Sequence, residues 1–140
     1  MDRELNIICQ ACSKPLGDDE HNPGNLWVSH AELATRRAAL AEWEREHLAP
    51  AADGSGPPMV GFRTMASHPE RVRWRATHEA CDSPADADAY TIASRRVRTW
   101  LDVVKWTSHL MGKTWINDTN WSTVIGEAAE GRSNLIQPVG

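Results

Sequence analysis

Two doublets, C-x2-C at Cys9 and Cys12 and H-x2-C at His78 and Cys81, constrain this 140-residue chain more than any other feature of its sequence. All three cysteines fall within the doublets, and His78 is the only one of six histidines in such a pair. This spacing lets each pair chelate one ion from a tight turn, and three thiolates with an imidazole suit a closed tetrahedral zinc site. The sequence therefore predicts one structural zinc ion that joins the two ends of the first eighty residues.

Other interpretations of the doublets stay open. The interval between them, residues 13–77, far exceeds that of small zinc fingers, and His30 competes with His78 as the fourth ligand. Buried free thiols with an unrelated histidine are a further alternative. A redox pair is less favoured, because redox C-x-x-C motifs open a helix, whereas this doublet lies between two short predicted strands and precedes Pro15. An odd number of cysteines excludes a complete disulfide framework and fits a reducing compartment.

A short hairpin followed by a helix is predicted for the first part of the chain. Residues 5–8 form an apolar strand leading into the first doublet, and residues 26–28 are its expected return strand. Ser29 and Glu32 match the S-x-x-E capping box, which starts a helix over residues 31–48. The inward stripe of this helix is predicted to contain Leu33, Leu40, Trp43 and His47.

Two further strands and two connecting segments are predicted before the second half of the chain. Residues 49–58, rich in Ala, Gly and Pro, predict a flexible loop, and residues 59–65 a strand. Residues 72–76 alternate apolar and basic side chains, as a strand with one buried face does. The core-facing positions are Val72, Trp74 and Ala76. The acidic residues 82–89 predict a connector with a short helical turn.

Two helices are predicted in the C-terminal part. The first covers residues 93–111 and ends at Gly112, and the second is capped by Asp118 and ends near Gly131. The first helix is expected to bury Val97, Trp100, Leu101, Val104, Ser108 and Met111. The second is expected to bury Trp121, Val124, Ile125 and Ala128. Residues 132–140 are predicted to form a loose tail.

A knuckle, a hairpin and a strand that enters a second ligand pair at a helix start resemble the treble-clef class of zinc fingers. The resemblance covers residues 5–90 and implies an α+β fold, with a zinc-stabilised module over residues 1–90 and an inserted helix at 31–48. A helical part over residues 91–131 is expected to pack on it. The layout of CQACSKPL, LWVSH, RWRATHEAC and WTSHLMGKTW also resembles small zinc proteins of actinobacteria and their phages, which implies no particular activity.

Catalytic motifs are weak in this sequence. Treble clefs include HNH-type nucleases, but the chain lacks their adjacent Asp-His or His-His pair, and residues 82–92 lack an Asn followed at helical spacing by His. Glu79 lies between His78 and Cys81 and suggests the H-x-E element of nucleobase deaminases, but it follows His78 without an intervening residue, and their P-C-x-x-C follows that histidine instead of preceding it. We therefore expect a non-catalytic binding or regulatory module, with a metal-dependent nuclease as the alternative.

A candidate partner surface is predicted near the C-terminal helices. Four of the seven tryptophans lie on predicted apolar faces, whereas Trp106 and Trp115 fit no inward stripe. Basic side chains gather in the same region although the net charge is −4. The surface, for a protein or nucleic-acid partner, consists of Arg95, Arg98, Lys105, Trp106, Lys113 and Trp115. A solvated helix face with no partner is the alternative.

The sequence also bounds the compartment. No stretch approaches the roughly 18 consecutive apolar residues of a membrane span. The first ten residues lack the charged-then-apolar layout of a secretory signal. We expect a soluble cytoplasmic protein with zinc as its cofactor and no membrane partner. A chain of 140 residues buries a modest core, and a metal ion that joins distant segments would stabilise it.

Overall fold

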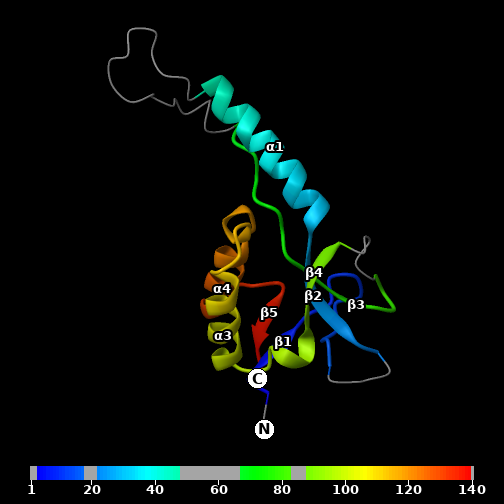
Figure 1. The fold of residues 1–140 in the computed structure, drawn as a ribbon. Coiled ribbons are helices and arrows are strands. Elements are labelled where there is room, and N and C mark those ends of the chain that lie inside the picture. Colours follow the sequence, from blue (N-terminus) through cyan, green and yellow to red (C-terminus); the bar gives the residue numbers. More distant parts are fainter. Residues whose placement is uncertain (1–2, 18–21, 48–66, 83–87, 140) are drawn as a thin grey trace.

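The computed structural model describes residues 3–17, 22–47, 67–82 and 88–139, which form the mixed α+β fold that was expected (Figure 1). The strands are β1 (Leu5–Ile7), β2 (Gly24–Ser29), β3 (Arg75–His78), β4 (Ala89–Ala93) and β5 (Ile136–Pro138). The α-helices are α1 (His30–His47), α3 (Trp100–Leu110) and α4 (Trp121–Ala129), with 3-10 turns η1 (Ser94–Arg96) and η2 (Ile116–Asp118). The predicted loop 49–58, the strand 59–65 and most of the connector 82–89 lie outside the described residues.

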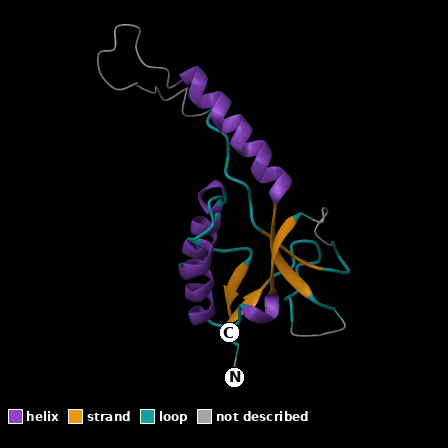
Figure 2. Cartoon of the chain, in the orientation of Figure 1, coloured by secondary structure: helices purple, strands orange, loops and turns teal. Residues whose placement is uncertain are grey.

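Two small antiparallel sheets lie beside the helix pair α3 and α4 (Figure 2). One sheet has the order β3-β2-β4, and the other pairs β1 with β5. The predicted hairpin between residues 5–8 and 26–28 is therefore wrong. Both edges of β1 are already bonded, since the Leu16 amide donates to the Ile7 carbonyl at 2.7 Å on one side and β5 pairs on the other. No edge is left for β2, which pairs with β3 and β4 instead.

The C-terminal segment belongs to the core, so the prediction of a loose tail is wrong for its described part. Ile136 pairs with Ile7 across the β1–β5 sheet, and the side chains of Leu135 and Ile136 are buried. The hydroxyl of Ser133 accepts hydrogen bonds from the Leu135 and Ile136 amides at 3.0 Å each, which fixes the turn after α4. Burial of these two apolar side chains explains why the segment is ordered.

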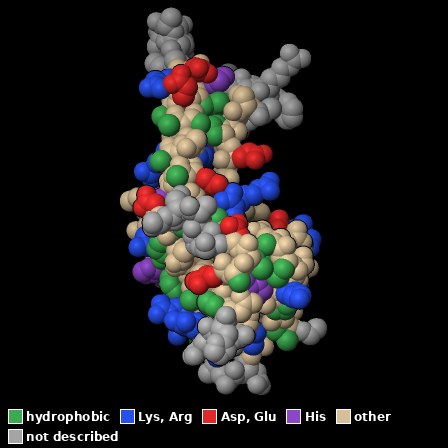
Figure 3. All heavy atoms as spheres, turned by 90° about the vertical axis from the view of Figure 1, so that its right-hand side faces the viewer, with side chains coloured by type: hydrophobic (Ala, Val, Ile, Leu, Met, Phe, Trp, Pro, Cys, Tyr) green, Lys and Arg blue, Asp and Glu red, His purple; other side chains and the backbone are tan. Residues whose placement is uncertain are grey.

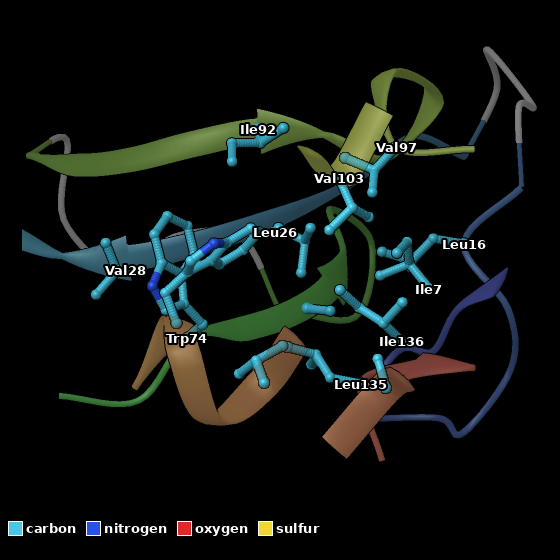
Figure 4. Packing of buried hydrophobic residues seen from close by; sticks show 14 of the residues in the cluster. Ile7, Leu16, Leu26, Val28, Trp74, Ile92, Val97, Val103, Leu135 and Ile136 are labelled. Carbon is cyan, nitrogen blue, oxygen red and sulfur yellow. The ribbon is translucent and has the colours of Figure 1, made fainter. Parts of the chain in front are cut away.

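Both sheets and the helices share one hydrophobic core. Figure 4 shows side chains converging from the two sheets, from α3 and from the segment after α4. Those it labels are Ile7, Leu16, Leu26, Val28, Trp74, Ile92, Val97, Val103, Leu135 and Ile136. Burial of Val72, Trp74 and Ala76 confirms the inward positions predicted for this segment. The sequence predicted a zinc-stabilised module over residues 1–90 and a helical part over residues 91–131. The boundary between these two parts falls inside β4, a strand that was not predicted.

α1 begins at the cap that the sequence predicts. It also carries a buried arginine, which was not predicted from the sequence. The Glu32 amide donates to the Ser29 hydroxyl at 3.2 Å, and Leu33 and Trp43 are buried as expected. Arg36, on the same face, is buried against the carboxylate of Asp118 in η2. Arg37 donates to the second oxygen of that carboxylate at 3.1 Å.

Asp118 is therefore an ion-pair partner of α1 and does not cap α4, contrary to the sequence prediction. The N-cap position of α4 is Asn120, whose side-chain oxygen accepts from the Trp74 amide at 2.8 Å. A buried guanidinium requires a counter-charge, and this requirement explains why the carboxylate faces α1. The expected end of α4 near Gly131 is confirmed, because the helix ends at Ala129, Glu130 is its C-cap, and Gly131 adopts a φ of 73°.

α3 starts later than predicted and turns a different face to the core. β4 and η1 occupy residues 89–96, and the helix begins after Thr99, whose hydroxyl accepts from the Asp102 amide at 3.1 Å in a capping box. The predicted inward residues Leu101, Val104 and Met111 are 60%, 63% and 73% exposed. The buried side chains are Val103 and Leu110.

The orientation of α3 follows from its contact with α4. The sequence of α3 carries apolar residues on two faces, and periodicity alone does not distinguish them. Thr107, on the face of Val103 and Leu110, accepts a hydrogen bond of 3.0 Å from the Trp121 indole of α4. This bond and the packing of the large Trp121 ring select the face that is buried.

Paired alanine substitutions on α3 test this orientation. Leu110→Ala is expected to lower the free energy of unfolding by about 2–5 kcal/mol, because it opens a cavity in the core. Leu101→Ala removes an exposed side chain, and its effect is expected to stay within about 0.5 kcal/mol. Urea denaturation monitored by tryptophan fluorescence measures both values. A larger loss from Leu101→Ala than from Leu110→Ala would contradict the orientation.

The ion pair between α1 and η2 gives a second test. Asp118→Ala leaves the buried Arg36 guanidinium without its carboxylate and is expected to destabilise the protein by about 3–5 kcal/mol. Arg37→Ala is the matched control, since the Arg37 side chain is 55% exposed and its ion pair is expected to contribute about 1 kcal/mol or less. Equal losses from the two variants, measured by denaturant unfolding, would show that burial of Arg36 is unimportant.

Candidate metal centre

The two doublets meet in space although residues 13–77 separate them in the sequence. The ligand atoms of Cys9, Cys12, His78 and Cys81 all lie within 4.8 Å of one another. Nδ1 of His78 lies 3.4 Å from the Cys12 sulfur and 3.8 Å from the Cys81 sulfur. Tetrahedral zinc with metal–ligand bonds of about 2.0–2.3 Å would place its ligand atoms about 3.5–3.8 Å apart. The cluster therefore has the size and the donor set to hold one metal ion.

A tight turn after β1 positions the first doublet. The Cys9 amide donates to the Lys14 carbonyl at 2.9 Å, and the Ser13 amide donates to the Cys9 carbonyl at 2.8 Å. Ser13 adopts a φ of 65°, in the left-handed region that such a turn requires. An isolated bridge between Ile8 and Pro15 closes the turn. The predicted knuckle is therefore present.

The second doublet lies at the end of β3 and in the turn that follows. The amides of Cys81 and Asp82 both donate to the His78 carbonyl at 3.0 Å, which curls the chain so that Cys81 returns to the histidine. β2 holds this end of β3, because Gly24 pairs with His78. A Cβ added at Gly24 would come within 2.7 Å of the Leu16 side chain, so a larger residue would force the buried Leu16 side chain to shift.

Burial is unequal within the cluster. Cys9 and His78 are buried, Cys12 is half-buried and Cys81 is exposed. A hollow of about 430 Å³ opens beside them, lined by Cys12, Lys14, Pro15, Gly17, Asn22, His78 and Cys81. Within the described ranges, the buried Oδ1 of Asn22 has no hydrogen-bond partner. Sequence reasoning did not indicate Asn22, because an asparagine in a turn-rich segment carries no ligand signal.

The thiols of the cluster differ in acidity. Burial opposes ionisation of Cys9, but hydrogen bonds from the amides of His78, Cys12 and Ala11 outweigh it and lower the Cys9 pKa to about 6. Desolvation, together with hydrogen bonding and repulsion from the thiolates of Cys12 and Cys9, raises the Cys81 pKa to about 11. Repulsion between neighbouring thiolates thus disfavours ionisation of all three thiols at once. A bound divalent cation would neutralise this repulsion.

His30 is placed elsewhere. Its ring lies edge-on against the Trp115 ring at 5.7 Å, and it is not a member of the cluster. Across residues 3–17, 22–47, 67–82 and 88–139, this cluster is the one group of three or more neighbouring His, Cys, Asp or Glu side chains that could hold a metal ion. Glu79, which follows His78, is exposed and accepts a hydrogen bond from the Asn25 amide group at 3.2 Å.

The predicted partner surface divides into two parts. Arg95, Arg98 and Lys105 line a depression of about 570 Å³ at the start of α3, and Trp106 lies beside Lys105 on the same helix. Lys113 and Trp115 lie beyond the other end of α3. The Lys113 ammonium is 5.5 Å from the centre of the Tyr90 ring. The rings of Tyr90, Trp74 and His30 surround Trp115, which is partly buried in this aromatic group.

Comparison with protein-family models, curated proteins and solved structures gives no match to this chain. The case for the site therefore depends on the geometry and chemistry of the four residues. Within the described segments, no helix combines the length and apolar character needed to cross a membrane.

Metal binding is expected to strengthen as the pH rises. At pH 7 the Cys9 thiol is largely ionised, whereas Cys81, with its pKa near 11, carries a proton that a metal ion must displace. Each displaced proton raises the affinity about tenfold per pH unit, so the expected increase between pH 7 and pH 8 is at least about tenfold. Below pH 6 the Cys9 proton must also leave, and the dependence becomes steeper. Chelator competition at several pH values measures this, and a flat profile would contradict the acidities given above.

Proposed function

We propose that Cys9, Cys12, His78 and Cys81 bind one structural zinc ion, and that the protein is a non-catalytic module that binds a macromolecular partner. The observation that carries this proposal is the convergence of the four ligand atoms within 4.8 Å. Three thiolates and one imidazole are soft or borderline ligands, a set that favours Zn²⁺ over hard cations such as Mg²⁺ or Ca²⁺.

A structural role fits this ligand set better than a catalytic one. Four protein ligands complete a tetrahedron and leave no position for a water molecule or a substrate, whereas catalytic zinc sites keep one position open. Glu79, which directly follows His78, is exposed and accepts a hydrogen bond from Asn25, so it is not directed toward a metal-bound water. A nuclease of the treble-clef class would need a second, oxygen-rich metal site, and the described residues offer no second cluster to support one.

The likeness to treble clefs is supported by the knuckle of the first doublet and by the antiparallel strand that leads into the second. A treble clef continues with a helix after its second ligand pair. In this chain a turn follows the second ligand pair at residues 79–82, and the next described element is β4. We propose a module of this class in which α1 is inserted between β2 and β3. Its layout would then resemble that of small zinc proteins of actinobacteria and their phages.

The zinc ion would act as a staple. It would connect the knuckle, which follows β1, to the end of β3, and these two segments belong to different sheets. Few hydrogen bonds join them otherwise, among them the bond of 2.8 Å from the Gln10 amide to the Ala76 carbonyl. A metal that bonds to both segments would therefore stabilise the whole core, because binding energy absent from the unfolded chain becomes folding energy.

Metal content and ligand substitution test the proposal together. Elemental analysis of the purified protein is expected to give one zinc per chain, and thiol titration is expected to find the cysteines protected until the protein unfolds. Cys9→Ser and His78→Ala are expected to lose the zinc and to lower the melting temperature by at least about 10 °C, since about 3 kcal/mol has this effect in a domain of this size.

The matched control is His30→Ala, which changes the alternative fourth ligand. This variant is expected to retain one zinc per chain, because its ring packs on Trp115 away from the cluster. Loss of zinc from His30→Ala with retention in His78→Ala would reverse the ligand assignment. Metal-free protein with three freely reactive thiols would refute the zinc proposal.

A further inference from the structure

α3 has a second apolar face that the core does not use. Leu101, Val104 and Met111 lie on one side of the helix, with Ser108 between them, at intervals of three, four and three residues. Among the described residues, the large hydrophobic side chains that are exposed are these three and Val139. An amphipathic surface helix normally turns its single apolar stripe inward, whereas α3 buries one stripe and leaves another in solvent. Such a concentration on one helix marks an interaction face.

Basic side chains border this face at its N-terminal end. Arg95, Arg96, Arg98 and Lys105 share with Leu101 the depression of about 570 Å³ described above. Two carboxylates are close, but both already accept hydrogen bonds from backbone amides at the helix start. Asp102 accepts from the amides of Arg98 and Thr99, and Glu4 accepts from the amide of Trp100.

The local charge therefore differs from that of the molecule. The chain has a net charge of −4, yet four basic groups face two carboxylates here. On the face seen in Figure 3, by contrast, acidic and basic side chains are interspersed. A concentration of one sign beside an apolar stripe favours a ligand that carries carboxylates next to apolar groups.

We propose that this face of α3 binds an amphipathic helix of a partner protein that carries acidic residues. Its apolar side chains pack on Leu101, Val104 and Met111, and its carboxylates pair with Arg95, Arg96 and Lys105. α3 is about 16 Å long at 1.5 Å per residue, which matches about three turns of a partner helix. This inference rests on the proposed function and gives its partner a chemical class.

A second copy of the chain fits this face poorly. If two α3 helices packed antiparallel, Arg95 and Arg96 of one copy would approach Lys113 of the other, and a parallel arrangement would place each basic group near its own equivalent. Like charges so close together destabilise an interface. α1 is no better match, because its exposed apolar residues are alanines, namely Ala31, Ala34, Ala38, Ala39 and Ala41.

A nucleic-acid partner would explain the basic side chains of this face but not its apolar side chains. Phosphates would pair with the arginines and the lysine, but contacts to a phosphate backbone give no role to Leu101, Val104 and Met111. A protein helix uses both parts at once, and this is the reason for preferring it.

Fluorescence anisotropy with designed peptides tests the proposal on the full-length protein, with the zinc content of each sample measured. The probe is a labelled helical peptide of roughly 18 residues, or five turns, with Leu at helical spacing and Glu on both flanks. A peptide with Lys in place of Glu is its control. The acidic peptide is expected to bind saturably, more weakly as salt is added, and the basic peptide is expected not to bind.

Substitutions on the face identify it as the binding site. The double variants Leu101→Ser/Val104→Ser and Arg95→Glu/Arg96→Glu are each expected to raise the Kd of the acidic peptide at least about tenfold. The control variants Ala41→Ser and Arg73→Glu, which change exposed residues elsewhere, are expected to bind like the parent protein. All four alter exposed positions, so unchanged melting temperatures are expected and show that the fold is retained.

Several outcomes would overturn the proposal. These are the absence of saturable binding by the acidic peptide, equal binding of the two peptides, or an unchanged Kd for Leu101→Ser/Val104→Ser. A dimer that this variant disrupts would assign the face to a second copy. Binding of a DNA oligonucleotide that is lost in Arg95→Glu/Arg96→Glu but retained in Leu101→Ser/Val104→Ser would assign it to nucleic acid. None of these results affects the zinc proposal, which the metal content of the same samples tests separately.

Discussion

Three thiols and one imidazole lie against one another where the knuckle meets the end of β3, and this contact joins segments of the two sheets. Thiolates so close together repel, and this repulsion adds to desolvation in raising the pKa of Cys81, whereas amide hydrogen bonds lower the pKa of Cys9. A divalent cation converts the repulsion into attraction. With a cation bound, the packing of β1 beside the three-stranded sheet would depend on ligand chemistry as well as on apolar burial, in a chain whose core is modest.

The sequence was sufficient to predict the ligand cluster because ligand chemistry is local. Spacing by two residues identifies Cys9 with Cys12 and His78 with Cys81 without any knowledge of the fold, and the chain has no other cysteine to consider. The start of α1 was predictable for a similar reason, since Ser29 caps a helix through an amide three residues away. Features set by neighbours in the sequence can be inferred from the sequence.

Features set by distant partners were missed. Strand β1 was predicted to pair with β2, whereas it pairs with β5 at the other end of the chain. The residues within 5–7 and 136–138 do not by themselves specify that pairing. Asp118 has the side chain of a helix cap, yet the burial of Arg36 draws its carboxylate to α1. The orientation of α3 depends on its packing against α4, including the bond between Trp121 and Thr107, which periodicity cannot represent. In each case a contact with a distant segment determines the structure, and the local sequence preference does not.

The metal centre and the exposed face of α3 are linked through β1. The knuckle begins two residues after this strand ends, and the residues at its start anchor α3. There the amides of Glu4 and Leu5 donate to the Arg98 carbonyl at 2.8 and 2.9 Å, and the Glu4 carboxylate accepts from the first amide of the helix. Loss of the metal would release one end of a strand whose other end fixes the start of α3. A metal ion bound at the cluster would therefore affect how firmly α3 is held, although it would not contact that helix.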